Sequence, residues 1–281
     1  MVALRTGLHE MVLASLGGAI LANLLLAMGI SFLVGGIRHH TQEYNQTSIR
    51  VYSSMMLIAV MSLLIPSAFH RVFGAVEFTH NENELNVAIA IILLTAYVLY
   101  LVFLLRTHKE FFKSKGGGHE PHGERWSLPK ALGLLLGASA GAAFMSELLV
   151  GAAEETGRVM GLSSVFIGIV FLSIVGGAVE SISAISMASK NKMDLSISIL
   201  LGSSIQIALF ISPLLVLCSL FVGPEQLNLS FGSGMIALLF LSVLIGELIC
   251  GDGQSNWYKG VQLIVVYLIL AMMLYFVPEA A

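Results

Sequence analysis

The sequence predicts an all-α polytopic membrane protein, and its composition, its long uncharged runs and its residue pattern all support this class. Of the 281 residues, 57% are hydrophobic and only 11% are charged, and the mean hydropathy is +0.89. Such a composition is too apolar for an ordinary soluble domain. The apolar residues show no strict alternation with polar ones, as a transmembrane barrel would require, so we expect helices.

Long uncharged runs recur along the whole chain, each of bilayer-spanning or near-spanning length. In chain order they cover residues 11–37, 51–69, 85–105, 131–146, 159–179, 195–224, 227–246 and 261–278. We therefore expect about eight full transmembrane helices, preceded by a short helix remnant over residues 1–7.

Basic residues gather in alternate connections between these runs. Eleven of the fourteen Lys and Arg residues lie in four connections, 37–50, 106–130, 189–194 and 252–260. Cytoplasmic loops of membrane proteins are enriched in Lys and Arg, so we expect these four on the cytoplasmic side and the C-terminus on the other. The acidic segment with Glu77, Glu82 and Glu84 is then expected to face outward.

One connection, residues 107–128, is rich in Gly, Pro and charge and contains His108, His119 and His122. This composition is typical of a flexible linker. We interpret the histidines as part of it, because their spacing matches no compact metal site. The chain is thus expected to divide into an N-terminal repeat over 1–106, this linker, and a C-terminal repeat over 129–281.

An internal comparison supports two repeats. Sliding the chain along itself by 184 residues brings Gly18 onto Gly202, and a short polar turn precedes a small-residue helix start in both copies. The two turns are expected on opposite sides of the membrane, as an inverted-topology repeat requires. The same shift from Glu180 leads to a position about five residues before Met1, so we expect the first repeat to be truncated at its start.

Glu180 lies near the middle of the apolar, membrane-length run 159–189. An ionised group at the bilayer centre costs roughly 2.5 to 3.5 kcal/mol on insertion scales, so such groups usually face a partner or a water-filled path. We therefore interpret Glu180 as an ion or proton site; the alternative is a structural carboxylate paired within the protein. A carboxylate that binds either a proton or a cation, but not both, couples two opposing fluxes.

A cation site in the membrane also needs neutral oxygens, because calcium takes six to eight oxygen ligands. Asn23, Ser203 and Gln206 supply amide and hydroxyl oxygens, and interhelical hydrogen bonding is their alternative role. Glycines allow close helix packing and an unwound backbone whose carbonyls reach an ion. The glycines for which we expect this role are Gly18, Gly176, Gly177 and Gly202.

Residues 175–185 read Val-Gly-Gly-Ala-Val-Glu-Ser-Ile-Ser-Ala-Ile, and residues 190–194 read Lys-Asn-Lys-Met-Asp. Residues 202–210 follow with Gly-Ser-Ser-Ile-Gln-Ile-Ala-Leu-Phe. Together these segments resemble the second signature repeat of the calcium/proton exchanger (CAX) family. Residues 14–26 are similar to the later part of that family's first signature repeat, and residues 252–257 resemble its penultimate loop.

The resemblance covers nearly the whole chain and implies an inverted-repeat antiporter fold that exchanges Ca²⁺, or a related cation, for H⁺. It also implies that Glu147 lies near the cavity mouth. Family members usually read Gly-Asn-Ala-x-Glu-His at the site, whereas Gly177 and Ser181 replace the Asn and the His here. The acidic half of the first signature repeat falls before Met1. A sodium-coupled exchanger, or a non-transporting homologue acting as a binding or assembly subunit, are the alternatives.

Other classes of function find little support in the sequence. It contains no catalytic triad, phosphate loop or zinc motif, so we expect neither an enzyme nor a bound cofactor. No basic stripe suggests nucleic acid. We interpret Cys218, Cys250 and the thirteen methionines as ordinary bilayer residues. The expected location is the bacterial cytoplasmic membrane, with the lipid bilayer, cations and protons as partners and a homo-oligomer left open.

Overall fold

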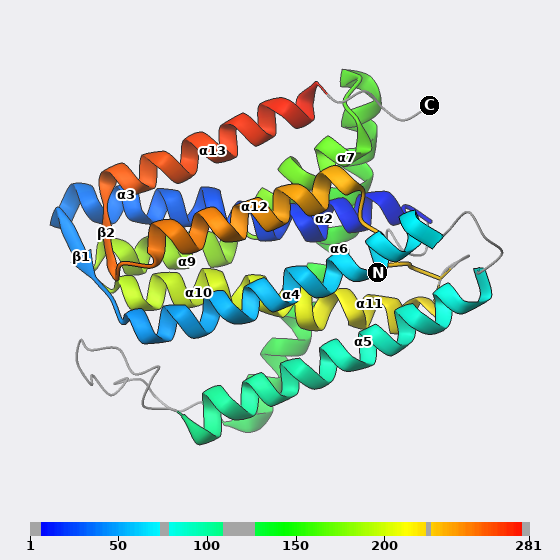
Figure 1. Cartoon of the computed structure of the whole chain (residues 1–281), viewed down its shortest axis with the longest axis horizontal. Coiled ribbons are helices and arrows are strands. Elements are labelled where there is room, and N and C mark those ends of the chain that lie inside the picture. Colours follow the sequence, from blue (N-terminus) through cyan, green and yellow to red (C-terminus); the bar gives the residue numbers. More distant parts are fainter. Residues whose placement is uncertain (1–6, 74–78, 109–126, 223–225, 277–281) are drawn as a thin grey trace.

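The computed structural model describes residues 7–73, 79–108, 127–222 and 226–276, most of which are helical. The remnant predicted over 1–7 and the centre of the predicted linker lie outside these residues, except for Gly7. Figure 1 shows long helices that run roughly along one direction, with a small pair of strands, β1 (Thr41–Glu43) and β2 (Gln254–Asn256), at one end.

The described elements fall into two halves on either side of residues 109–126. The first half of the described chain contains α2 (His9–Leu21), the π-helical η1 (Ala22–Ala27), α3 (Met28–His39), β1, α4 (Gln46–Phe73), α5 (Thr79–Val102) and the π-helical η2 (Phe103–Thr107). The second half contains α6 (Leu128–Met160), α7 (Ser164–Phe166), the π-helical η4 (Ile167–Leu172), α8 (Ser173–Gly176), α9 (Ala178–Ser189), α10 (Met193–Gln206), the π-helical η5 (Ile207–Ile211), α11 (Ser212–Ser219), α12 (Ser233–Cys250), β2 and α13 (Trp257–Tyr275).

Within the described residues, six helices are long and apolar enough to cross a membrane, and a bent pair over 167–176 and 178–189 makes a seventh candidate. The apolar part of α12, residues 234–250, is shorter than a full span. Each of the eight predicted runs meets a helix, but the predicted count of eight full spans is not reproduced. Two local features account for the difference: a break at Gly177 and a non-helical segment before α12.

Residues 227–231, predicted as the start of a helix, form that non-helical segment. Alternate backbone amides donate to side chains of other helices: Leu227 to Ser219 Oγ at 2.9 Å, Leu229 to Asn86 Oδ1 at 3.3 Å, and Phe231 to Ser67 Oγ at 2.9 Å. The three apolar side chains of the segment are buried. Irregular backbone is tolerated at membrane depth when protein groups satisfy it, and these bonds do so here.

The offset of 184 residues recurs in the order of the helices. α2 begins at residue 9 and α10 at 193, while α3 begins at 28 and α11 at 212; a π-helical segment joins each pair. Figure 1 shows the two pairs running in opposite directions, since α3 ends and α10 begins near β1. This is the geometry of an inverted-topology repeat. The division of the chain at residues 107–128 stays a prediction.

Three of the four connections predicted to be cytoplasmic meet at the end of the molecule that carries Arg38, Lys190, Lys192 and Lys259, which we call the basic end. Here β1 pairs antiparallel with β2. Gln42 Nε2 donates to the Ala188 carbonyl at 3.0 Å, and the Asn45 amide donates to Asp194 Oδ1 at 2.6 Å. The fourth connection lies largely outside the described residues, as does Glu77, whereas Glu82 and Glu84 belong to the first two turns of α5.

The turn between α12 and α13 belongs to the same end. Lys259 Nζ donates to both carboxylate oxygens of Asp252, at 2.6 and 2.5 Å. Burial alone would raise the pKa of Asp252, but hydrogen bonds from Lys259 and from the Gln254 amide hold this pKa below its usual value. The Tyr44 hydroxyl donates to the Cys250 carbonyl at 2.9 Å, so the connection after α3 is tied to the end of α12.

Backbone contact between α3 and α13 makes Gly260 sensitive to substitution. A Cβ at Gly260 would lie 2.4 Å from the Leu33 amide nitrogen and 2.6 Å from the Gly29 carbonyl oxygen, both rigid backbone atoms. We expect Gly260→Ala to lower the free energy of unfolding by about 1–3 kcal/mol or more, because overpacking forces the helices apart. The measurement is the thermal aggregation midpoint of the detergent-solubilised protein.

Gly137→Ala is the matched control, since a Cβ at Gly137 on α6 meets nothing within 4 Å. Alanine is the better helix former by about 0.8–1 kcal/mol, so this variant is expected to be unchanged or slightly stabilised. Equal midpoints for the two variants would contradict the close approach of α3 and α13.

Candidate functional site

The sequence predicts one uninterrupted run over 159–189, but the structure breaks it at Gly177. The part ending with α8 and the part beginning with α9 are inclined by 59°. Gly177, with φ −92° and ψ 9°, departs from helical geometry at the corner. Its amide donates to the Ser173 carbonyl at 3.0 Å, and its carbonyl accepts from the Ser181 amide at 3.0 Å. The break therefore keeps these backbone groups bonded without water.

Glu180 lies in the first turn of α9, directly after this break. Its side chain is half-buried, and Oε2 is fully buried without a hydrogen-bond partner among the described residues. Burying a polar atom without a partner is costly, and a carboxylate oxygen is the costliest kind when ionised. A bound proton or a bound cation removes this cost. The break thus leaves one ionisable oxygen of Glu180 buried without a partner among the described residues.

Close packing of α2 and η1 against η4 and α8 brings Asn23 to the break. A Cβ at Gly18 would lie 2.3 Å from Ser173 Oγ and 2.5 Å from Ile169 Cα, so only glycine fits there. Asn23 is 2% exposed, and its Oδ1 lies 3.6 Å from where a Gly177 Cβ would be. Gly18 therefore serves the site through close approach, whereas Asn23 presents an amide oxygen beside the corner.

The hairpin of α9 and α10 places the remaining polar candidates at the depth of Glu180. The turn between these helices lies at Asn191, with Glu180 eleven residues before it and Gly202 eleven residues after it. The two helices pack against each other, so Gly202 and Ser203 lie level with Glu180. A Cβ at Gly202 would meet nothing within 4 Å, and Gln206 at the end of α10 is exposed. Open space thus adjoins this face of α10.

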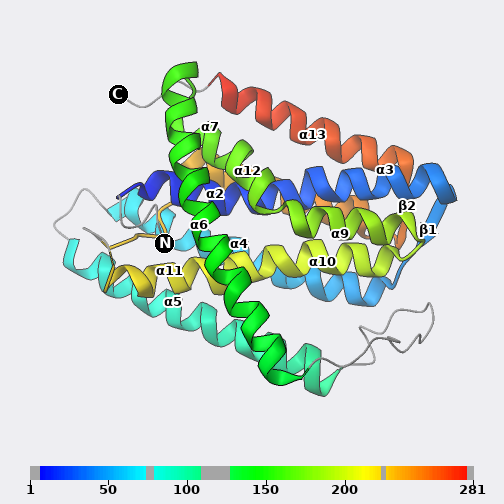
Figure 2. The same ribbon diagram turned by 180° about the vertical axis from the view of Figure 1, so that it is seen from behind.

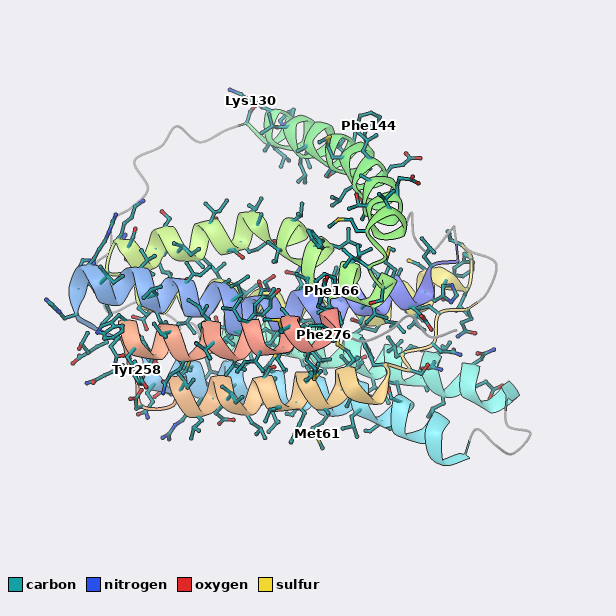
Figure 3. The ribbon with its side chains drawn as sticks, turned by 90° about the horizontal axis from the view of Figure 1, so that it is seen from above. Met61, Lys130, Phe144, Phe166, Tyr258 and Phe276 are labelled. Carbon is teal, nitrogen blue, oxygen red and sulfur yellow. The ribbon has the colours of Figure 1, made fainter. Side chains whose placement is uncertain are left out.

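The structure does not bring Glu147 to this group. Glu147 is exposed near the middle of α6, and the span 128–157 of that helix has no buried residue in its most apolar window. Figure 2 shows α6 crossing the other helices at an angle, and Figure 3 shows its residues Lys130 and Phe144 standing off from them. Among the helices described, α6 makes its main contact with η4. The expected place of Glu147 at a cavity mouth stays a prediction.

The donor set at the break combines one carboxylate with neutral oxygens. No group of three or more His, Cys, Asp or Glu residues able to hold a metal occurs within the part of the chain that the structure describes. Four of the candidate residues belong to the break or to the segment packed beside it: Asn23, Gly176, Gly177 and Glu180. Ser203 lies on α10, level with Glu180. Such a set is chemically suited to a hard cation held loosely, or to a proton.

Sequence reasoning missed Ser173, which holds the break to α2. Its hydroxyl is buried and lies 2.8 Å from the Gly168 carbonyl oxygen and 3.2 Å from the Ser15 carbonyl oxygen, with both of which it forms hydrogen bonds. The only signal in the sequence was a serine four residues before Gly177 in an apolar run. A single hydroxyl in such a run is common in membrane helices, so that signal is weak.

Comparison with known proteins places this architecture among exchangers. The sequence profile of the sodium/calcium exchanger protein family matches residues 1–106 and 130–276. The chain is 36% identical to the Ca(2+)/H(+) antiporter of Synechocystis sp., covering 99% of this chain and 78% of that protein. It is 38% identical to the Ca(2+)/H(+) antiporter ChaA of Bacillus subtilis, covering 96% and 76%.

A solved structure, that of native YfkE, superposes with a TM-score of 0.83 at 35% identity, covering 99% of this chain and 78% of that one. The crystal structure of the H+/Ca2+ exchanger CAX has a TM-score of 0.66 at 12% identity over 95% of this chain, a likeness of fold alone. These matches confirm the resemblance that the motifs around Glu180 indicated.

Removal of the Ser173 hydroxyl tests how the break is held. We expect Ser173→Ala to lower the free energy of unfolding by about 1–3 kcal/mol, because the buried Gly168 and Ser15 carbonyls lose a donor. Ser54→Ala is the matched control, since the Ser54 hydroxyl donates to Val51 on an exposed face and its loss is expected to cost less than about 0.5 kcal/mol. Thermal unfolding in detergent compares the two; equal losses would contradict the anchoring role of Ser173.

Proposed function

Because this chain belongs to the sodium/calcium exchanger protein family, we propose that it exchanges Ca²⁺ for H⁺ across a membrane. The names of its relatives in Synechocystis sp. and Bacillus subtilis, both Ca(2+)/H(+) antiporters, support this assignment. The apolar helices make the chain an integral membrane protein. Its bacterial relatives support a place in the bacterial cytoplasmic membrane.

The observation that carries the proposal is the buried, unpartnered Oε2 of Glu180 at a break in a membrane-length helix. Either a bound proton or a bound cation would give this carboxylate oxygen a partner. Since each excludes the other, occupancy by Ca²⁺ on one side and by H⁺ on the other side gives exchange in opposite directions. Coupling then needs no second ion site.

The ligands of the cation are assigned from the residues around the break. Glu180 supplies the carboxylate, Asn23 the amide oxygen, and the backbone at Gly176 and Gly177 the carbonyl oxygens, as broken helices do in other transporters. Ser203 contributes a hydroxyl oxygen from α10, and Gln206 an amide oxygen. Calcium accepts six to eight such oxygens in flexible geometry, and water completes the set.

Alternating access is assigned to the inverted repeats. The helices α2–η1–α3 and α10–η5–α11 run antiparallel, and α10 packs against η1, so the two copies meet beside the break. Rocking of one group of helices against the other exposes a central site to each side in turn. The hydrogen bonds of Gln42 and Asn45 hold the basic end together in the state described above.

Replacement of Glu180 by glutamine tests this function. We expect Glu180→Gln to lower the initial rate of proton-driven calcium uptake roughly a hundredfold, because loss of a buried charged ligand costs about 3 kcal/mol of cation affinity. The assay follows ⁴⁵Ca²⁺ entry into proteoliposomes with an acidic interior. Glu43→Gln is the matched control: Glu43 is exposed on β1, and its variant is expected to transport at the unaltered rate. Equal uptake by Glu180→Gln and the unaltered protein would exclude this role for Glu180.

The driving ion is tested in the same vesicles. We expect a proton gradient to drive uptake and an outward sodium gradient at equal pH to drive none. Uptake with sodium alone would instead favour a sodium-coupled exchanger. Folded, reconstituted protein without uptake under either gradient would favour a non-transporting binding or assembly subunit.

A further inference from the structure

A small cavity near the basic end is lined by three sulfur-bearing residues that the proposed exchange does not use. It has a volume of about 10 Å³, which is room for one water-sized guest. Its lining includes Met28 of α3, Met56 of α4 and Cys250 of α12, together with Ser53 and Glu247. The three sulfur-bearing residues thus come from three different helices.

The sulfur-bearing side chains are almost completely buried. Cys250 is 2% exposed, and Met28 and Met56 are each 1% exposed. The Cys250 thiol donates to Met28 Sδ over 3.4 Å, so these two sulfur atoms lie in direct contact, and a small shift of the flexible Met28 side chain spaces them for one soft metal ion. The sequence, in which the methionines are scattered, gives no sign that two of them meet Cys250.

The charge of the surroundings selects the class of ion. Thiolate and thioether ligands favour soft cations over Ca²⁺ or Mg²⁺. A monovalent cation with one thiolate and two neutral thioethers forms a complex without net charge, which an apolar interior accepts. A divalent cation would leave a positive charge among the three buried sulfur ligands, because the Glu247 side chain is exposed and is not buried with them. The exposed side chain of Glu247 marks the mouth of the cavity, where a carboxylate attracts an entering cation.

We propose that this cavity binds one monovalent thiophilic cation, Cu(I) or Ag(I), through the Cys250 thiolate and the thioethers of Met28 and Met56. On binding, the S–H bond of Cys250 breaks, its proton passes to water, and a sulfur–metal bond forms with no change of oxidation state. The bound ion links α3, α4 and α12. Leu24 of η1 also lines the cavity, so the ion lies next to the segment that carries Asn23.

The test uses Ag(I), which needs no reductant, titrated calorimetrically into the full chain in chloride-free detergent buffer. Cys218→Ser is the parent variant, because Cys218 is the other free thiol and is only half-buried. We expect the parent to bind one Ag(I), and Cys218→Ser with Cys250→Ser to lose that site. Cys218→Ser with Met28→Leu, a change of similar volume, is expected to bind roughly tenfold more weakly.

Cys250→Ser alone provides the matched reference, since it leaves the thiol of Cys218 as a simple ligand. The site at Cys250 is expected to bind at least about tenfold more tightly than this reference. Unchanged affinity in the Met28→Leu variant, or equal affinity at the two thiols, would overturn the proposal. X-ray absorption at the silver edge of the parent needs no core substitution: three sulfur ligands support the site, and a single sulfur overturns it. None of these readouts depends on transport.

Discussion

A break in a helix at membrane depth must satisfy its own backbone hydrogen bonds, and much of this structure follows from that constraint. No water in the hydrocarbon region replaces a lost helical bond. The corner at Gly177 meets the requirement through the Ser173 carbonyl and the Ser181 amide. α2 packs directly against the helix before the corner, and this close approach is possible because Gly18 has no side chain. The position of Glu180 thus depends on the backbone of the corner and on the glycine of α2 that faces it.

Wide helical turns accompany each element of the proposed site. Asn23 lies in η1, η4 precedes the break, and η5 follows Gln206. Directly after η4 and after η5, a serine hydroxyl donates five residues back, from Ser173 to the Gly168 carbonyl at 2.8 Å and from Ser212 to the Ile207 carbonyl at 2.9 Å. π-helical turns are rare and occur frequently at functional sites. Their recurrence at equivalent places in the two repeats, η1 and η5, links local geometry to the internal symmetry.

Hydropathy was enough to predict the helical class, and the alignment of Gly18 with Gly202 predicted the repeat offset seen in the helix order, whereas the role of Glu180 stays a prediction. The break itself was not predicted as a corner, because apolar composition over 159–189 is the same for a straight and a bent helix. The non-helical residues 227–231 were missed for a related reason: their partners, such as Asn86, are distant in sequence. Glu147 was assigned by resemblance, and its exposed place on α6 depends on packing that sequence does not encode locally.

The pairing of β1 with β2 has a consequence for how the protein is made. Ser255 and Gln42 are joined across 213 positions of the chain, and Tyr44 reaches Cys250 across 206. The ribosome synthesises α3 and α4 long before α12 and α13, so the contacts of the basic end with the last two helices are absent through most of synthesis. The Gln42 side chain has its partner in the Ala188 carbonyl once α9 exists, but the Tyr44 hydroxyl has no Cys250 carbonyl to bond until α12 is made. Closure of this end is then a late step of assembly, set by the arrival of the last hairpin rather than by insertion of the first helices.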